Sequence, residues 1–172
     1  MKNASTLTVR GLVPDMPLKF NVDEFYFTSP SEHTLEGQAY DLEMQIVHSM
    51  NTDYLPDETK LKSRKLVLSV LFQVKAGANN TFLGSLNIPT LDFIPTLPIA
   101  DFLSSISKLY IYYDGSMSRP PCTENVYRFV MFDAQSMSAD QLKYFTNHYS
   151  GNARGVQKLN GRPVLRVSKT TS

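Results

Sequence analysis

Residues 24–34 read Glu-Phe-Tyr-Phe-Thr-Ser-Pro-Ser-Glu-His-Thr, and residues 42–48 read Leu-Glu-Met-Gln-Ile-Val-His. Apolar and polar side chains alternate in both stretches, a pattern that predicts two β-strands. Successive side chains of a strand point to opposite faces of a sheet, so Tyr26 and Thr28 share one face. If the two strands pair as a hairpin, Gln45 reaches the same point from the neighbouring strand. A metal site needs converging donors, and such a hairpin supplies three positions for them.

The rest of the chain predicts a mainly β protein with few helices. Residues 66–75 form an almost unbroken apolar run, typical of a central strand covered on both faces. Residues 84–101 contain three prolines and are expected to be extended and irregular. Ser138 and Gln141 form a possible capping box at the start of a helix. Further strands are expected to begin at Tyr110 and to cover residues 125–133.

The overall composition fits one globular domain over residues 1–172. Seventeen basic and sixteen acidic residues give a net charge of +1, and no pattern typical of nucleic-acid binding is present. No apolar run approaches the roughly 20 residues that cross a bilayer. The N-terminus lacks the apolar stretch of a signal peptide, which favours an intracellular or organellar location. A secreted or cell-surface location is the alternative if a signal was processed.

Two further features have a structural and a functional interpretation. The single cysteine, Cys122, can form no internal disulfide and is expected to be a small buried apolar residue. Residues 51–65 are polar and hold four basic side chains, which favours a solvated loop over a basic binding patch.

Four motifs together resemble the α-class carbonic anhydrases. They are the two strands above, residues 115–124 (Gly-Ser-Met-Ser-Arg-Pro-Pro-Cys-Thr-Glu) and the tail Asn-Ala-Arg-Gly-Val-Gln-Lys-Leu-Asn-Gly-Arg at 152–162. The resemblance covers about residues 18–165. It implies a central, largely antiparallel twisted sheet with a few peripheral helices. Domains of this family begin roughly 70 residues earlier, so the resemblance implies that the N-terminal part is absent here.

The resemblance places Tyr26, Thr28 and Gln45 where the family has three zinc-binding histidines. In such enzymes three neutral imidazoles hold zinc, which lowers the pKa of a bound water to about 7. A phenol, an alcohol and a carboxamide are poor zinc ligands, and no carboxylate is added at these positions. We therefore expect no zinc, no other metal or cofactor, and a chain that is not an enzyme. Residual carbonate dehydratase activity is the less favoured alternative.

The residues around the former zinc position are retained in part. By resemblance, Glu32 accepts a hydrogen bond from Ser118, which stands where the family has a threonine. Glu43 matches the carboxylate that orients the third histidine, and with Gln45 in that place Glu43 is expected to accept its amide hydrogen bond.

New positive charges stand close to the former zinc position. Arg119 and Arg128 introduce them beside the position where the resemblance puts the substrate pocket, and they are candidates for binding an anion. His33 and His48 match histidines of the family that are not zinc ligands.

These features lead to two functional hypotheses. The first is a structural or interaction subunit of a larger assembly, in which other protein subunits or self-association cover exposed sheet edges and apolar surface. The second is a surface binding module for an anionic ligand such as a sulfated glycan, motivated by Arg119, Arg128 and the basic residues at 60–65. No nucleophile motif or phosphate-binding loop is present in the sequence.

Overall fold

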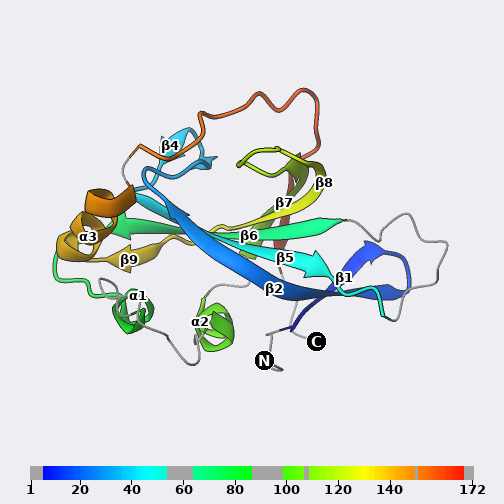
Figure 1. Ribbon diagram of the computed structural model, residues 1–172, viewed down its shortest axis with the longest axis horizontal. Helices are drawn as coiled ribbons and strands as arrows, with labels where there is room; N and C mark the ends of the chain where they lie inside the picture. The colour runs from blue at the N-terminus through cyan, green and yellow to red at the C-terminus, as the bar shows by residue number, and fades with distance from the viewer. Residues whose placement is uncertain (1–5, 54–63, 87–98, 107–108, 150, 169–172) are drawn as a thin grey trace.

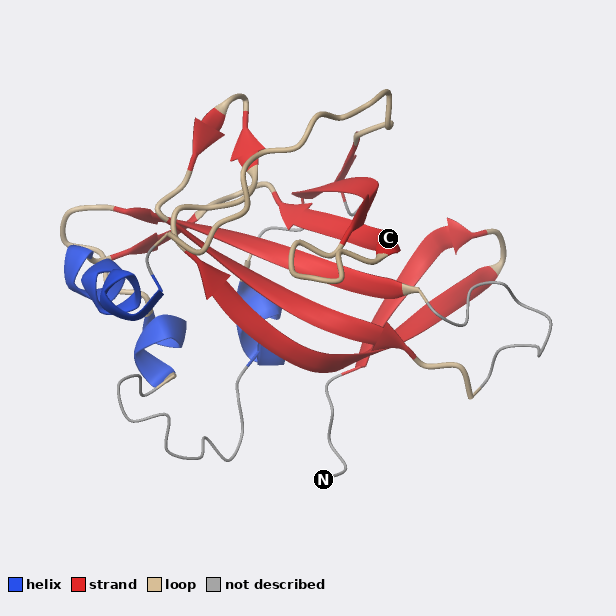
Figure 2. Ribbon diagram, turned by 45° about the horizontal axis from the view of Figure 1, so that its top comes forward, coloured by secondary structure: helices blue, strands red, loops and turns tan. Residues whose placement is uncertain are grey.

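The computed structural model describes residues 6–53, 64–86, 99–106, 109–149 and 151–168. A curled, mixed sheet dominates it, and the helices lie at the periphery (Figures 1 and 2). The strand order is β1-β2-β5-β6-β8-β7-β10, with β9 paired to β6 beyond the end of β8. Strand β6 pairs in parallel with β8 and β9, and the other neighbours pair antiparallel. The expected largely antiparallel, twisted sheet is therefore confirmed. The strands are β1 (Thr6–Val13), β2 (Met16–Thr28), β5 (Leu42–Met50), β6 (Lys65–Val74), β7 (Leu109–Ser116), β8 (Glu124–Met131), β9 (Gln135–Met137) and β10 (Leu165–Ser168).

The two faces of the sheet have different partners. One face packs against the helices and forms the main core, which includes Phe20, Met44 and Ile46. The opposite face carries smaller apolar clusters around Tyr26 and Leu71. Because side chains alternate along each strand, this opposite face also receives the polar residues that the sequence analysis singled out.

Strands β2 and β5 pair antiparallel, as the sequence predicted. Tyr26 lies directly opposite Gln45, and Thr28 lies opposite Glu43. The chain between them forms a small ribbon of β3 (Thr34–Leu35) and β4 (Gln38–Ala39). Gly37 stands at its turn with a φ of 78°, a conformation that favours glycine. The two predicted strands are confirmed, and their pairing places Tyr26 opposite Gln45.

The segment expected to be irregular begins and ends with helices. Helix α1 (Thr81–Ser85) starts at Asn80, whose side chain accepts a hydrogen bond from the Leu83 backbone at 3.1 Å. Helix α2 (Ile99–Ser105) follows the proline-rich stretch. Apolar packing explains these helices, because Phe82 and Phe102 stack with ring centroids 4.1 Å apart against the core. The expectation for residues 84–101 was wrong at both ends, and residues 87–98 lie outside the described part.

Helix α3 (Ala139–Tyr149) starts at the predicted capping box. The Gln141 backbone donates to the Ser138 hydroxyl at 3.1 Å, and the Ser138 backbone donates to the Gln141 side chain at 3.1 Å. Phe145 anchors the helix on the sheet, with its ring centroid 4.5 Å from that of Phe27. The prediction of this helix is confirmed.

A long C-terminal loop follows helix α3 and crosses the face of the sheet opposite the main core before β10 pairs with β7 (Figure 1). Asn152 fixes its beginning: the side chain accepts from the Ser29 backbone at 3.1 Å and donates to the Phe27 carbonyl at 2.9 Å. Strand β10 was not predicted from the sequence. Among the described helices, none has the length and apolar character that crossing a membrane requires.

Two other expectations have different outcomes. Cys122 is partly exposed rather than buried, because it lies in the turn between β7 and β8 with a φ of 56°. Its backbone N–H donates to the Arg119 carbonyl at 2.9 Å. Lys60 and Lys62 lie outside the described residues, so the solvated-loop prediction stays a prediction. Lys65 begins β6 and forms an ion pair with Asp23 at 3.0 Å.

Candidate functional site

Two of the three former ligand positions, Tyr26 and Gln45, take part in a hydrogen-bonded cluster on one face of β2 and β5. The Tyr26 hydroxyl donates to the Gln45 amide oxygen at 2.9 Å, and both side chains are buried. Thr28 is buried beside them, and its hydroxyl has no hydrogen-bond partner among the described residues. The sequence analysis placed these residues together correctly, but the bond between Tyr26 and Gln45 was not anticipated.

A buried guanidinium completes this cluster. Arg128 comes from the middle of β8 and is 4% exposed. One of its terminal nitrogens donates to the Gln45 amide oxygen at 2.7 Å, and its Nε donates to the Ser116 carbonyl at 3.0 Å. Arg128 therefore lies beside Gln45, one of the three former ligand positions. The guanidinium is more deeply buried than a surface anion-binding residue would be.

Gln45 connects Arg128 to Glu32. The amide nitrogen of Gln45 donates to one carboxylate oxygen of Glu32 at 2.6 Å. The other oxygen of Glu32 accepts the Arg154 backbone N–H at 3.0 Å. The expected bond from Ser118 to Glu32 is not formed, because the Ser118 hydroxyl lies 3.1 Å from that of Tyr26 and bonds there instead.

The predicted partner of Gln45 was also wrong. Glu43 does not bond to Gln45, because both carboxylate oxygens of Glu43 already contact residues of the turn that follows β2. One oxygen accepts the backbone N–H groups of Glu32 and His33 at 2.9 and 3.0 Å, and the other contacts the His33 ring at 2.7 Å. Burial acts to raise the pKa of Glu43, but the charge and hydrogen bonds of His33 outweigh it and hold the pKa below its usual value.

His33 links the buried Glu43 carboxylate to Tyr113 on β7. The second ring nitrogen of His33 lies 2.7 Å from the Tyr113 hydroxyl. Burial raises the pKa of Tyr113, and Arg128 opposes this effect in part. Tyr113 was missed by the sequence analysis, since it comes from a distant strand without a motif of its own. His48 has a different role. Its ring nitrogen lies 3.0 Å from the Ile46 carbonyl oxygen, and it takes no part in this cluster.

Arg119 covers Tyr26 from the solvent side. Its guanidinium carbon lies 3.4 Å from the centroid of the Tyr26 ring, a cation–π arrangement. Burial raises the pKa of Tyr26, while the hydrogen bond to Ser118 and the nearby charge of Arg128 act in the opposite direction. Both arginines singled out from the sequence therefore lie beside Tyr26, one above its ring and one near its hydroxyl.

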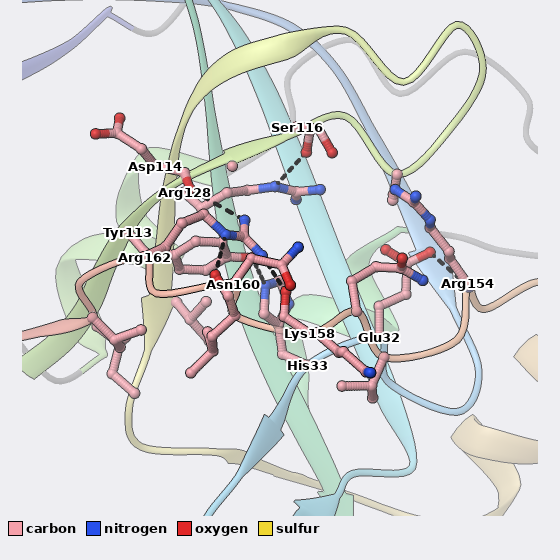
Figure 3. Close-up of a pocket in the computed structure, with 18 of the residues that line it drawn as sticks. Glu32, His33, Tyr113, Asp114, Ser116, Arg128, Arg154, Lys158, Asn160 and Arg162 are labelled. Carbon is pink, nitrogen blue, oxygen red and sulfur yellow. Dashed lines mark hydrogen bonds between the residues drawn. The ribbon is translucent and has the colours of Figure 1, made fainter.

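A pocket of about 770 Å³ opens between this cluster and the C-terminal loop (Figure 3). Arg128, Glu32 and Ser118 line it, whereas the three former ligand positions do not. Arg162 fixes the loop that forms its outer wall: it donates to the backbone carbonyls of Leu159 at 2.9 Å, Lys158 at 3.0 Å and Asp114 at 3.2 Å. The tail motif had been recognised in the sequence, but its place over the pocket had not.

These residues do not fit a zinc ion. Zinc sites in proteins use thiolate, imidazole and carboxylate ligands, none of which Tyr26, Thr28 or Gln45 provides. The Tyr26 hydroxyl and the Gln45 oxygen are already bonded to each other, and a guanidinium lies 2.7 Å from that oxygen. Within the described ranges, no group of three or more His, Cys, Asp or Glu residues is arranged to hold a metal.

Comparisons with known proteins agree with the fold and with the motifs. The eukaryotic-type carbonic anhydrase family matches residues 2–168. A carbonic anhydrase of Klebsiella pneumoniae is 33% identical over 171 residues, which cover 94% of this chain and 61% of the relative. The structure of the α-carbonic anhydrase of Photobacterium profundum superposes with a TM-score of 0.73 at 31% identity, covering 94% of this chain and 69% of that one. A structure of dioscorin complexed with ascorbate superposes with a TM-score of 0.67 at 25% identity, covering 90% and 65%.

These matches correct one expectation and establish the relationship of the chain. The chain spans about 61% of the length of the Klebsiella relative, and about 54% of a similar carbonic anhydrase of Nostoc. The expectation that the chain is not an enzyme is contradicted, because its relatives and structural neighbours are carbonic anhydrases, a family of enzymes. The expectation rested on three replaced side chains, whereas the match to the family covers residues 2–168. The chain belongs to the eukaryotic-type, or α-class, carbonic anhydrase family.

Proposed function

We propose that this member of the carbonic anhydrase family serves as an interaction or structural subunit of a larger assembly, and that Tyr26, Thr28 and Gln45 hold no zinc. The observation that carries the proposal is the guanidinium of Arg128, 2.7 Å from the Gln45 amide oxygen. A permanent positive charge occupies the space beside the position where a divalent cation would sit. Repulsion between the two charges opposes zinc binding there.

The state of Tyr26 supports the same conclusion. A phenol binds a metal best as phenolate, but burial raises the pKa of Tyr26 and disfavours that form. Zinc would also have to break the bond from Tyr26 to Gln45. Each of these costs adds to the weak intrinsic affinity of an alcohol and an amide for zinc.

The exposed apolar side chains of the C-terminal segment support a role in assembly. Large apolar residues exposed on the described surface are concentrated there: Val156 is 67% exposed, Leu159 55%, Leu165 51% and Val164 44%. Clustered exposed apolar surface of this kind marks interaction sites. Strand β10 lies at one edge of the sheet, where its free backbone groups can pair with another strand. Another protein subunit or a second copy of the chain would cover this surface.

Binding of an anionic ligand is a second candidate function. The dioscorin structure named above contains ascorbate, an organic anion. In the present chain a buried arginine lines a pocket of about 770 Å³. A small organic acid or the charged group of a sulfated glycan would satisfy this arginine.

Metal analysis and mass measurement test the first proposal. The full chain, purified from a zinc-supplemented source, is expected to contain far less than one zinc per chain by mass spectrometry. Light scattering is expected to give a mass above the 19.4 kDa of one chain, and Leu159→Asp is expected to lower it. Stoichiometric zinc, or carbon dioxide hydration that a zinc chelator removes, would contradict the zinc part. A stable monomer from the natural source would contradict the assembly part.

A further inference from the structure

We propose that Arg128 binds the carboxylate of an organic acid whose apolar body occupies the pocket beside it. The proposal deepens the anion-binding function proposed above and rests on it. In both, a guanidinium holds the anion and no zinc ion is required. The site consists of Arg128, the Ser118 hydroxyl and the apolar wall described below.

The charge of Arg128 is buried without an ion pair. Its side chain is 4% exposed, and its hydrogen bonds go to the neutral oxygens of Gln45 and Ser116. The ion pairs among the described residues involve other side chains. Burying a charge is unfavourable unless an opposite charge or strong hydrogen bonds compensate it. A bound anion would supply the missing partner.

The guanidinium has donors available for that partner. Arginine carries five N–H groups. Two are used in the bonds to Gln45 and Ser116, which leaves three without a bond to the described residues. Arg128 lines the pocket, and Figure 3 shows its guanidinium at the pocket wall below Ser116. A planar carboxylate matches the fork of a guanidinium and can accept two parallel hydrogen bonds.

Glu32 lines the same pocket but does not neutralise Arg128 directly. One of its oxygens accepts from Gln45 and the other from the Arg154 backbone, so both already have donors that hold the carboxylate in place. The Gln45 amide separates Glu32 from the guanidinium. A ligand carboxylate would therefore approach the free side of Arg128, away from Gln45. Arg119 lies above the Tyr26 ring and is not among the residues that line the pocket.

The remaining wall of the pocket indicates what the ligand carries besides its charge. Six aliphatic side chains are among the lining residues: Leu35, Ile111, Val130, Val156, Leu159 and Val164. An inorganic ion would leave this surface in water, whereas an aromatic or aliphatic acid would cover it. The pocket volume of about 770 Å³ is in the range of sites that hold small organic molecules.

Benzoate and benzamide provide a matched pair of probes, because they share a ring and differ in charge. Calorimetry and the melting temperature of the full chain are measured with each probe. Benzoate is expected to bind and to raise the melting temperature, and benzamide and sulfate are expected to have little effect. Arg128→Gln is expected to weaken benzoate binding at least about tenfold, since it removes a charged hydrogen-bond donor. Arg166→Gln is the control, because Arg166 packs over Phe132 and does not line the pocket.

A measurement on the unaltered chain covers the case in which Arg128→Gln does not fold. Benzoate is expected to shift the side-chain N–H resonances of Arg128, assigned by comparison with Arg128→Lys, and benzamide is not. Equal binding of both probes, no binding of benzoate, or unchanged affinity in Arg128→Gln would overturn the proposal.

A chelator separates this result from the zinc proposal. The titrations are repeated with 1,10-phenanthroline, a chelator without a carboxylate. Benzoate binding that persists supports the arginine site. Binding that disappears together with measured zinc would overturn both the zinc proposal and the arginine site. Zinc-free protein that fails to bind benzoate would overturn the arginine site alone.

Discussion

Gln45 separates Arg128 from Glu32 and bonds to both: its amide oxygen accepts from the guanidinium at 2.7 Å, and its amide nitrogen donates to the carboxylate at 2.6 Å. An amide can do this because its planar group carries both an acceptor, the oxygen, and a donor, the NH₂ group. The buried charge of Arg128 and the opposite charge of the partly buried Glu32 are thereby connected without direct contact. A third bond, from the Tyr26 hydroxyl, also reaches the Gln45 amide oxygen.

Replacing this amide should reduce stability. Gln45→Met keeps the length of the side chain but leaves Arg128 and Glu32 each without one charged hydrogen bond. We expect the free energy of unfolding to fall by about 3 kcal/mol, because each such bond contributes about 1.5 kcal/mol or more. Urea denaturation measures the change. Gln38→Met on the exposed strand β4 is the control and should change stability little; equal urea midpoints for the two variants would contradict the assigned role.

The capping box of helix α3 gives a second stability prediction. Ser138→Ala removes the hydroxyl that accepts the Gln141 backbone N–H. We expect a loss of about 1 kcal/mol, typical of N-cap serines. Ser104→Ala, at an exposed position in α2, serves as the comparison because its hydroxyl bonds to a carbonyl of its own helix. A loss at Ser104 as large as at Ser138 would argue against a specific capping effect.

Local patterns in the sequence predicted those parts of the fold that depend on neighbouring residues. Alternation along β2 and β5 predicted that Tyr26, Thr28 and Gln45 share one face, because strand periodicity fixes it. The cap of α3 likewise needs only residues three apart. Helices α1 and α2 were missed because core packing of Phe82 and Phe102 offsets the unfavourable local sequence.

The bonding pattern of the site could not be predicted in the same way. Arg128 bonds to a residue 83 positions away, and Arg154 bonds to one 122 positions away. The sequence indicated that both Glu32 and Glu43 lie near Gln45. It could not show which carboxylate would accept the hydrogen bond from the Gln45 amide. That choice depends on the turn after β2, whose backbone N–H groups already donate to Glu43.

His48 should make stability depend on pH near neutrality. Burial lowers the pKa of its imidazole, an effect that hydrogen bonds to the backbone of Leu66 and Ile46 and the nearby charge of Asp23 oppose in part. In the unfolded chain the pKa is about 6.5. Between that value and the lower folded pKa, the unfolded chain binds a proton that the folded chain does not, so stability falls as pH decreases through about 6.5.

The urea midpoint at pH 7.5 and at pH 5.5 measures this effect. We expect the unaltered chain to lose stability between the two values, and His48→Gln to lose less over the same interval. His148→Gln, at an exposed position in α3, should retain the full pH dependence. An unchanged difference in His48→Gln would show that another group causes the pH dependence.

Restoring the three histidines should not be sufficient to restore zinc binding while Arg128 remains. A variant with Tyr26→His, Thr28→His and Gln45→His supplies the three imidazoles of a zinc site. The guanidinium, which now bonds to Gln45, would then lie within a few ångströms of the ion. At about 5 Å and an effective dielectric constant of about 20, repulsion between a single and a double charge is several kcal/mol.

We expect the triple variant to bind zinc at least a hundredfold more weakly than the same variant with Arg128→Leu added. Competition with a fluorescent chelator measures both affinities, circular dichroism verifies that both variants fold, and the triple variant with Arg166→Leu controls for the loss of a positive charge elsewhere. Equal zinc affinity with and without Arg128 would mean that the buried guanidinium does not oppose a cation at this position.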